Sequence, residues 1–246
     1  MIMTFRISFL LLPLLPLMAC QAKVAEYKNC AYQTSDTELQ VYNDLLIELV
    51  EGWFYNLYLG ERREELTKEV ERNRIADSAQ LKRFEQKAIE LQHEQFGDTA
   101  RFRIMYLAQK LIRKREVTEF LHNQYRTTVA NKDNYFLNNF STDSAAVVAT
   151  LSEPQQKYKP EDFHACTFKV ISLGKATSYQ ELGLMQKQRA IGQISFSEIY
   201  WNKQQTRGVL YYEFYCGGLC GKGEFIEFEK VDGHWKIVGM HQLFIS

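Results

Sequence analysis

The sequence predicts an α+β fold in which N-terminal amphipathic helices pack on a C-terminal four-stranded antiparallel meander. Three observations support this prediction. Apolar residues recur at helical spacing after residue 36, and apolar and polar residues alternate after residue 192. The dipeptide Asp232-Gly233 between two alternating segments is a strong signal for a two-residue β-hairpin turn.

The first predicted helix begins near Ser35. Ser35 is suited to cap it, and Glu38 stands three residues later, where it would complete a capping box. The apolar stripe that follows predicts a largely buried helix ending near Gly60, and it contains Leu39, Tyr42, Leu46, Leu49, Trp53 and Leu57.

Further helices are expected in the middle of the chain. A second amphipathic helix follows Asp77, with Leu81, Phe84, Ala88 and Leu91 on one face. The stretch 101–112 suits a strand or a helix equally, and a helix is expected around Val117–Tyr125. Residues 126–165 are expected to be loops with one short helix near 135–140.

Four strands are expected in the last quarter of the chain. They cover about Gly192–Tyr200, Val209–Tyr215 and Glu224–Val231, and the last begins at Trp235. Short connections between consecutive strands favour an antiparallel meander. One face of this sheet is expected to pack on the helices and the other to face water.

The composition limits the classes of protein. The chain has 246 residues, with 30 basic and 30 acidic side chains and 46% apolar residues. This balance excludes disorder and binding of nucleic acid through bulk positive charge. The length fits one or two globular domains with a sizeable core.

The N-terminus has the layout of a secretory signal. Arg6 precedes an apolar run from Ile7 to Leu17, which Pro13 and Pro16 interrupt. The run ends in Leu17-Met18-Ala19-Cys20, which resembles the bacterial lipobox, whose cysteine becomes lipidated after cleavage.

This resemblance implies a lipoprotein anchored through acyl chains such as palmitate on Cys20. Gln21, rather than Asp, at the next position implies sorting to the outer membrane, facing the periplasm. The expected organisation is therefore a signal peptide at 1–19, a tether at 20–35, a mainly helical region at 36–165 and a mixed region at 166–246 that ends in the meander.

Four cysteines remain when Cys20 is set aside. An even number outside the cytosol suggests disulfides, and we favour Cys216–Cys220 together with Cys30–Cys166 among the three connectivities. Two alternatives stay open: a redox-active pair at Cys216 and Cys220, and a zinc site that adds His164 and Cys166.

The C-terminal stretch resembles that of uncharacterised bacterial lipoproteins and secreted proteins. The segments that carry the resemblance are Ile194-Ser195-Phe196-Ser197, Trp201-Asn202, 212–223, Gly233-His234-Trp235-Lys236-Ile237 and Ile245-Ser246. The Cys-Gly-Gly-x-Cys-Gly-x-Gly segment from Cys216 to Gly223 is its most distinctive part. Members usually have Phe where Trp201 stands, and they often end in Trp-x-Ser. The resemblance implies architecture and compartment, but no activity.

No catalytic set, metal site or cofactor is predicted. His241 with Glu213 or Glu227 is a weak acid–base candidate, and the tyrosines at 211, 212 and 215 are candidates for stacking on a ligand. We therefore expect a cell-envelope binding or interaction module, held to the membrane through Cys20, whose partner is a periplasmic protein or a small ligand and not nucleic acid. The alternative is an envelope enzyme with a site near the Cys216–Gly223 loop.

Overall fold

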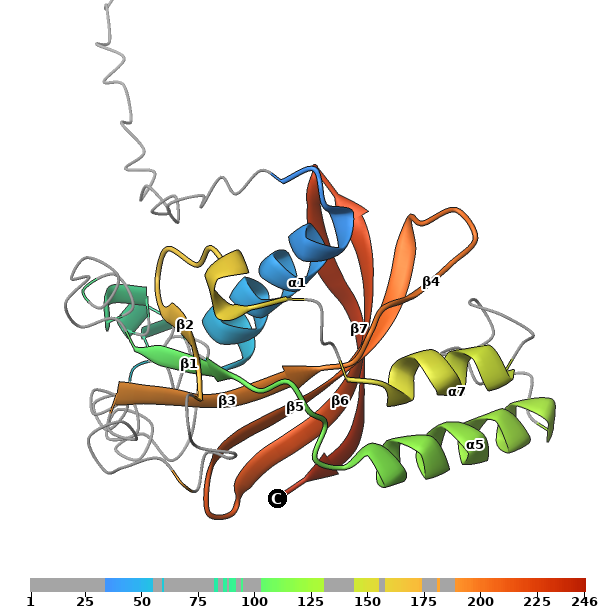
Figure 1. Cartoon of the computed structure of the whole chain (residues 1–246). Coiled ribbons are helices and arrows are strands. Elements are labelled where there is room, and N and C mark those ends of the chain that lie inside the picture. Colours follow the sequence, from blue (N-terminus) through green and yellow to red (C-terminus); the bar gives the residue numbers. More distant parts are fainter. Residues whose placement is uncertain are drawn as a thin grey trace, which may run out of the picture.

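The computed structural model describes residues 34–54, 59, 82–83, 86–87, 89–91, 94, 103–130, 144–154, 158–173, 181 and 189–246. Within these residues the protein has a mixed α+β fold, with one seven-stranded sheet and a small number of helices (Figure 1). The mixed class agrees with the sequence prediction, but the sheet is larger than expected.

The strand order is β2-β1-β3-β5-β6-β7, and β4 pairs with β5 beside this path. Strand β1 runs parallel to both of its neighbours, and the other pairs are antiparallel. The strands are β1 (Ile104–Leu107), β2 (Lys169–Ser172), β3 (Ala190–Phe196), β4 (Tyr200–Trp201), β5 (Arg207–Gly217), β6 (Cys220–Val231) and β7 (His234–Ile245).

The prediction of a four-stranded meander was therefore wrong. The four expected strands correspond to β3, β5, β6 and β7, which are adjacent and antiparallel, but β1, β2 and β4 extend the same sheet. The extra strands have only two to four residues each, and β1 and β2 pair in parallel across a long stretch of sequence. Their pairing depends on contacts that no local pattern encodes.

The hairpin turns follow from local chemistry. Asp232 and Gly233 have φ angles of 51° and 87°, so the expected turn between β6 and β7 is present. The β5–β6 turn contains Gly217 and Gly218, with φ angles of 122° and 20°. Glycine adopts positive φ without a steric penalty, which explains why glycines stand here.

Helix α1 (Thr37–Glu48), extended by the π-helical turn η1 (Leu49–Trp53), covers one face of the sheet. Its cap is Asp36, not Ser35 as predicted, because Asp36 Oδ1 accepts the Leu39 N–H at 3.0 Å. As predicted, α1 presents a buried apolar face. That face packs with alternate residues of β5 and β6, and the shared cluster includes Val41, Leu45, Leu49, Leu210, Tyr212, Phe214, Ile226 and Phe228.

Helices α5 (Lys114–Ala130) and α7 (Ser144–Ser152) cover the opposite face of the sheet. Val117, Leu121, Val147 and Leu151 pack there against Val209, Tyr211 and Phe225. The expectation that one face meets water was therefore wrong at β5, where helices cover both sides of the strand (Figure 1).

The middle of the chain agrees in part with the sequence predictions. The helix predicted around Val117–Tyr125 is α5, and the ambiguous stretch 101–112 contains β1. Helix α7 and the 3-10 turn η4 (Pro160–Asp162) lie where loops were expected. The helix predicted after Asp77 falls largely outside the described residues, and the short helix near 135–140 falls entirely outside them.

Candidate functional site

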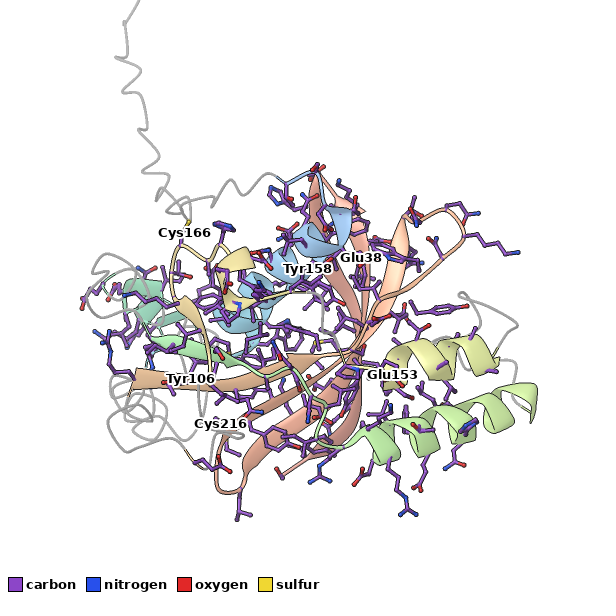
Figure 2. All side chains as sticks on the ribbon, in the orientation of Figure 1. Glu38, Tyr106, Glu153, Tyr158, Cys166 and Cys216 are labelled. Carbon is purple, nitrogen blue, oxygen red and sulfur yellow. A yellow bond between two sulfur atoms is a disulfide. The ribbon has the colours of Figure 1, made fainter. Side chains whose placement is uncertain are left out.

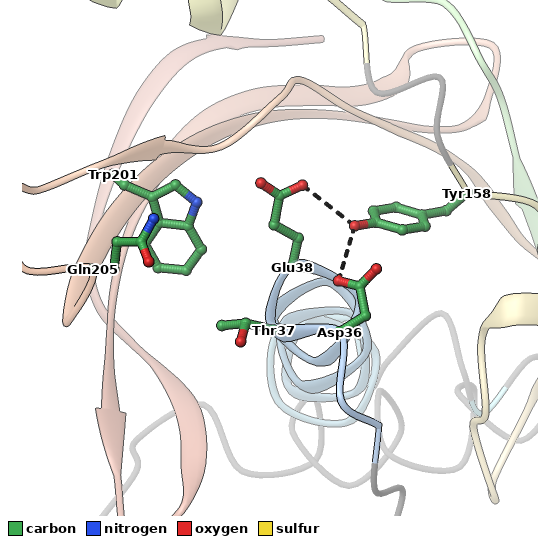
Figure 3. Close-up of a pocket in the computed structure, with 6 residues that line it drawn as sticks. All are labelled: Asp36, Thr37, Glu38, Tyr158, Trp201 and Gln205. Carbon is green, nitrogen blue, oxygen red and sulfur yellow. Dashed lines mark hydrogen bonds between the residues drawn. The ribbon is translucent and has the colours of Figure 1, made fainter.

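A pocket of about 440 Å³ lies where the start of α1 meets β4 and the turn after it. The described residues that line it come from three parts of the chain: the start of α1, the segment before η4, and β4 with the turn after it (Figure 3). They are Asp36, Thr37, Glu38, Tyr158, Trp201 and Gln205.

The first turn of α1 places the acidic side of the pocket. Asp36 caps the helix, so its carboxylate is held at the helix end by the Leu39 N–H. Acidic side chains are favourable in a first turn because the helix dipole is positive there. Helix geometry thus presents Asp36 and Glu38 together at the pocket.

The β4–β5 turn positions the opposite side of the pocket. Asn202 Oδ1 accepts the N–H groups of Thr206 at 2.9 Å and Arg207 at 3.2 Å, which closes the turn around Gln205. Trp201 packs edge-on against Trp235 and Phe228, with ring centroids 5.3 Å and 5.5 Å away. These contacts fix the indole ring as a wall of the pocket.

Tyr158 joins the two carboxylates. Its hydroxyl group lies 3.3 Å from Asp36 Oδ1 and 3.3 Å from Glu38 Oε2 (Figure 3). Burial, followed by the two carboxylates, raises the pKa of Tyr158 well above its ordinary value. The phenol therefore stays protonated at physiological pH and acts as a hydrogen-bond donor rather than as a base or nucleophile.

Tyr158 is itself supported by the core. Its ring contacts Tyr42 edge-to-face at 5.1 Å, and the Tyr42 hydroxyl donates to the Ser197 carbonyl at 2.9 Å. The pocket combines two acidic groups, one fixed donor and an aromatic wall. This set can bind and orient a polar ligand, whereas its tyrosine is not prepared for nucleophilic or base chemistry.

The residues singled out in the sequence lie elsewhere. Cys216 and Cys220 form a disulfide that closes the β5–β6 hairpin, far from Glu38 and Tyr158 in Figure 2. Leu219 at its tip is 90% exposed. This loop has the geometry of a tight hairpin turn closed by a disulfide.

Cys166 is also disulfide-bonded, while Cys20 and Cys30 lie outside the described residues. The Cys30–Cys166 pairing stays a prediction. Since Cys166, Cys216 and Cys220 are all oxidised here, they do not offer thiolates to a zinc ion beside His164. Among the described residues, no group of three or more histidine, cysteine or acidic side chains is arranged to hold a metal ion.

The structure brings His241 near Glu227 rather than Glu213. His241 Nε2 lies 3.9 Å from Glu227 Oε1, which is too far for a direct hydrogen bond. Burial raises the pKa of Glu227 and lowers the pKa of His241, so both groups are shifted toward their neutral forms. Glu213 instead accepts hydrogen bonds from the Ile112 and Arg113 N–H groups.

The tyrosine candidates are also mostly structural. Tyr211 and Tyr212 are fully buried, on opposite faces of β5, and Tyr215 contacts Arg113 through its hydroxyl group. Sequence analysis did not select any residue of the pocket for its chemistry. Glu38 was explained by the predicted helix start, and Tyr158 lies 122 residues from Asp36, so no local motif joins these residues.

Comparison with known proteins adds no further constraint, because no protein family, curated protein or solved structure matches the chain. The resemblance to bacterial lipoproteins therefore stays a prediction. The helices of the described region include none with the length and apolar character needed to cross a bilayer.

Proposed function

We propose that the protein is a lipid-anchored binding module of the bacterial cell envelope and that the pocket at the start of α1 is its ligand site. The observation that carries the proposal is the convergence of Asp36, Glu38, Tyr158 and Trp201 on one open pocket of about 440 Å³. Small-molecule sites of this size typically combine an aromatic wall with a few fixed polar groups.

The position of the pocket in the sequence fits an anchored protein. Asp36 follows Cys20 by sixteen residues, a length that spans at most about 55 Å when extended. An acylated Cys20 would therefore hold the pocket within this distance of the membrane surface. Several acyl chains on one cysteine make a stable anchor.

The phenol of Tyr158 serves this pocket as a hydrogen-bond donor rather than as a base or nucleophile. The raised pKa of Tyr158 keeps its proton in place, and its hydroxyl group is already directed at two carboxylates. A pocket of this kind recognises groups that complement it. The pocket therefore binds a small ligand or an accessible group on a periplasmic protein, which are the two partners expected from the sequence.

The pocket is tested by a fragment screen on the full chain, purified in a neutral detergent and followed by amide and indole NMR signals. We expect shifts to concentrate on residues 36–38, Tyr158, Trp201 and Gln205. A chemically diverse library that leaves these signals unchanged would contradict the pocket assignment.

The anchor is tested separately by mass spectrometry of the N-terminal peptide from the native host. We expect acylated Cys20 as the first residue. An unmodified Cys20, or an intact leader, would remove the lipoprotein half of the proposal without affecting the pocket.

A further inference from the structure

We infer that the second half of β7 pairs with the same strand of a second copy of this chain, which adds an interaction surface to the proposed ligand pocket. Strand β7 lies at one end of the strand order, so one of its sides has no neighbouring strand among the described residues. The open edge of a sheet presents backbone N–H and C=O groups that can pair with another strand. The two halves of β7 differ in whether these groups have partners.

The register between β6 and β7 shows which backbone groups point outward. Gly221 and Ser246 exchange both N–H···O bonds, at 3.1 Å and 2.8 Å, and so form a hydrogen-bonded pair. Such pairs alternate along β6 with pairs whose backbone groups point away from each other, and each bulge in β7 adds a residue without changing this alternation. The β7 residues opposite the even-numbered residues of β6 therefore direct their backbone groups outward, and they are Trp235, Ile237, Met240, Gln242 and Ile245.

Helix α1 closes the first half of this edge. Asp44 accepts the Trp235 N–H at 2.8 Å. Glu48 accepts the Ile237 N–H at 3.2 Å. Both bonds agree with the alternation derived from the other end of the strand, because both amides point away from β6. Another strand cannot pair here without displacing two carboxylates of the helix.

The second half of the edge is open. Within the described part of the chain, the outward backbone groups of Met240, Gln242 and Ile245 have no hydrogen-bond partner. Natural proteins often protect such an edge with lysine, another charge or proline. Residues 239–245 include no lysine, arginine, aspartate, glutamate or proline, and Ile245 is 70% exposed. This half of β7 thus lacks the usual features that prevent pairing with another strand.

A second copy of β7 fits this edge. In an antiparallel arrangement with a twofold axis through His241, Met240 of each copy lies opposite Gln242 of the other copy. Both residues direct their N–H and C=O groups outward, so each such pair can exchange N–H···O bonds. The whole chain has 30 basic and 30 acidic side chains, so two copies can approach each other without net repulsion.

The two bulges in β7 limit the length of the new ladder. Bulges at Val238 and Leu243 bend the strand and increase its twist, which is one way in which natural edges avoid pairing. The run 239–242 between them is regular and contains Met240 and Gln242. The twofold pairing therefore uses only the regular part of the strand. So short a ladder predicts a reversible dimer whose population depends on protein concentration.

The test uses the wild-type full chain in a neutral detergent at low and high protein concentration. Sedimentation velocity measures the dimer fraction, which we expect to rise with concentration. Amide exchange followed by NMR then locates the interface. We expect the Met240 and Gln242 amides to exchange about tenfold more slowly in the dimer. The Trp235 and Ile237 amides are the internal control, because α1 already binds them, and they should not change.

A lysine at the open edge should weaken the pairing. Gln242→Lys adds a charged side chain at an exposed position of the edge, and we expect the dissociation constant of the dimer to rise about tenfold. Gln109→Lys is the matched control, because Gln109 is exposed in the connection between β1 and α5, and it should leave the dissociation constant unchanged.

A chain that stays monomeric at high concentration would overturn the inference. A dimer in which the Met240 and Gln242 amides exchange as fast as in the monomer would also overturn it, because another surface would then form the dimer. The wild-type experiment decides the matter even if Gln242→Lys fails to fold. Either negative result would leave the ligand pocket in place.

Discussion

Replacing Glu213 with alanine should remove several kcal/mol from the free energy of unfolding. Glu213 is completely buried, and its carboxylate lies under the segment that leads into α5. It accepts the N–H groups of Ile112 at 2.5 Å and Arg113 at 2.8 Å, together with the Tyr211 hydroxyl at 3.3 Å. Glu213 thus joins β5 to the start of a helix 100 residues earlier.

The magnitude follows from these contacts. A hydrogen bond to a charged group contributes about 1.5–3 kcal/mol, and Glu213 accepts two short ones from backbone N–H groups. Against this, burial disfavours the ionised carboxylate and raises the pKa of Glu213. After that offset we expect Glu213→Ala to cost about 3 kcal/mol. Glu213→Gln keeps the shape and one acceptor oxygen, so we expect about half of that loss.

The assay is urea denaturation at neutral pH with the disulfides intact, followed by circular dichroism. Glu229→Gln is the control, because the Glu229 side chain is 39% exposed and its pair with Arg207 at 3.2 Å lies partly in solvent. Such pairs contribute about 0–1 kcal/mol. A loss from Glu213→Ala no larger than that from Glu229→Gln would refute the role assigned to the buried carboxylate.

Three further predictions concern the sheet. Burial raises the pKa of Glu227 above its ordinary 4.5. The protonated Glu227 side chain therefore makes its full contribution to stability below pH 4.5, and this contribution is lost as the pH rises through the raised pKa. Thermal melts should therefore show Glu227→Gln gaining on the wild type as the pH rises above 4.5, and parallel profiles would contradict this. A Cβ on Gly223 would overlap the Tyr211 hydroxyl and the Phe244 ring, whereas one on Gly239 would lie 3.5 Å from the nearest Glu227 carbon. Denaturation should therefore show that Gly223→Ala lowers the free energy of unfolding by about 1–3 kcal/mol and that Gly239→Ala lowers it much less. Equal losses of stability in the two variants would argue against this packing. Replacing Cys216 and Cys220 with serine opens a five-residue loop and should lower the free energy of unfolding by about 2 kcal/mol through chain entropy. Chemical denaturation measures this loss. Global unfolding of the variant would show that the disulfide contributes more than loop closure.

Local signals predicted the elements that local chemistry controls. The Asp232-Gly233 turn was predicted because both positions need positive φ, and both have it. The buried face of α1 and the existence of α5 follow from apolar spacing. In each case the signal and the structure lie within a few residues of each other.

The sheet's size needed long-range information. Ile104 of β1 pairs with Lys169 of β2, far along the chain, and each strand has four residues. Helix α7 lies in a stretch that was expected to be loops. It has only nine residues, and its Val147 and Leu151 pack against α5 and β5. Contacts with other elements therefore stabilise a helix that is too short to give a clear periodic signal.

The pocket was not predicted from the sequence, because its acidic residues have a simpler local explanation. A carboxylate at a helix start is normal capping chemistry, so Asp36 and Glu38 gave no functional signal. Trp201 stood out only as a departure from the family resemblance, where phenylalanine is usual. Only the fold brings Tyr158 to the two carboxylates.

The way α1 is attached to the sheet explains how such distant residues form a defined pocket. Strand β7 lies at one end of the strand order, and α1 carboxylates bind its backbone. Asp44 accepts the Trp235 N–H at 2.8 Å, and Glu48 accepts the Ile237 N–H at 3.2 Å.

These bonds fix α1 against the strand whose Trp235 also packs on Trp201. Contacts with the first half of β7 therefore hold both sides of the pocket in position: the acidic side through α1, and the aromatic wall through Trp235. A site held by a helix and a sheet in this way loses little conformational freedom when a ligand binds, which favours a pre-formed binding pocket. The same attachment makes α1 the element on which the pocket's geometry depends.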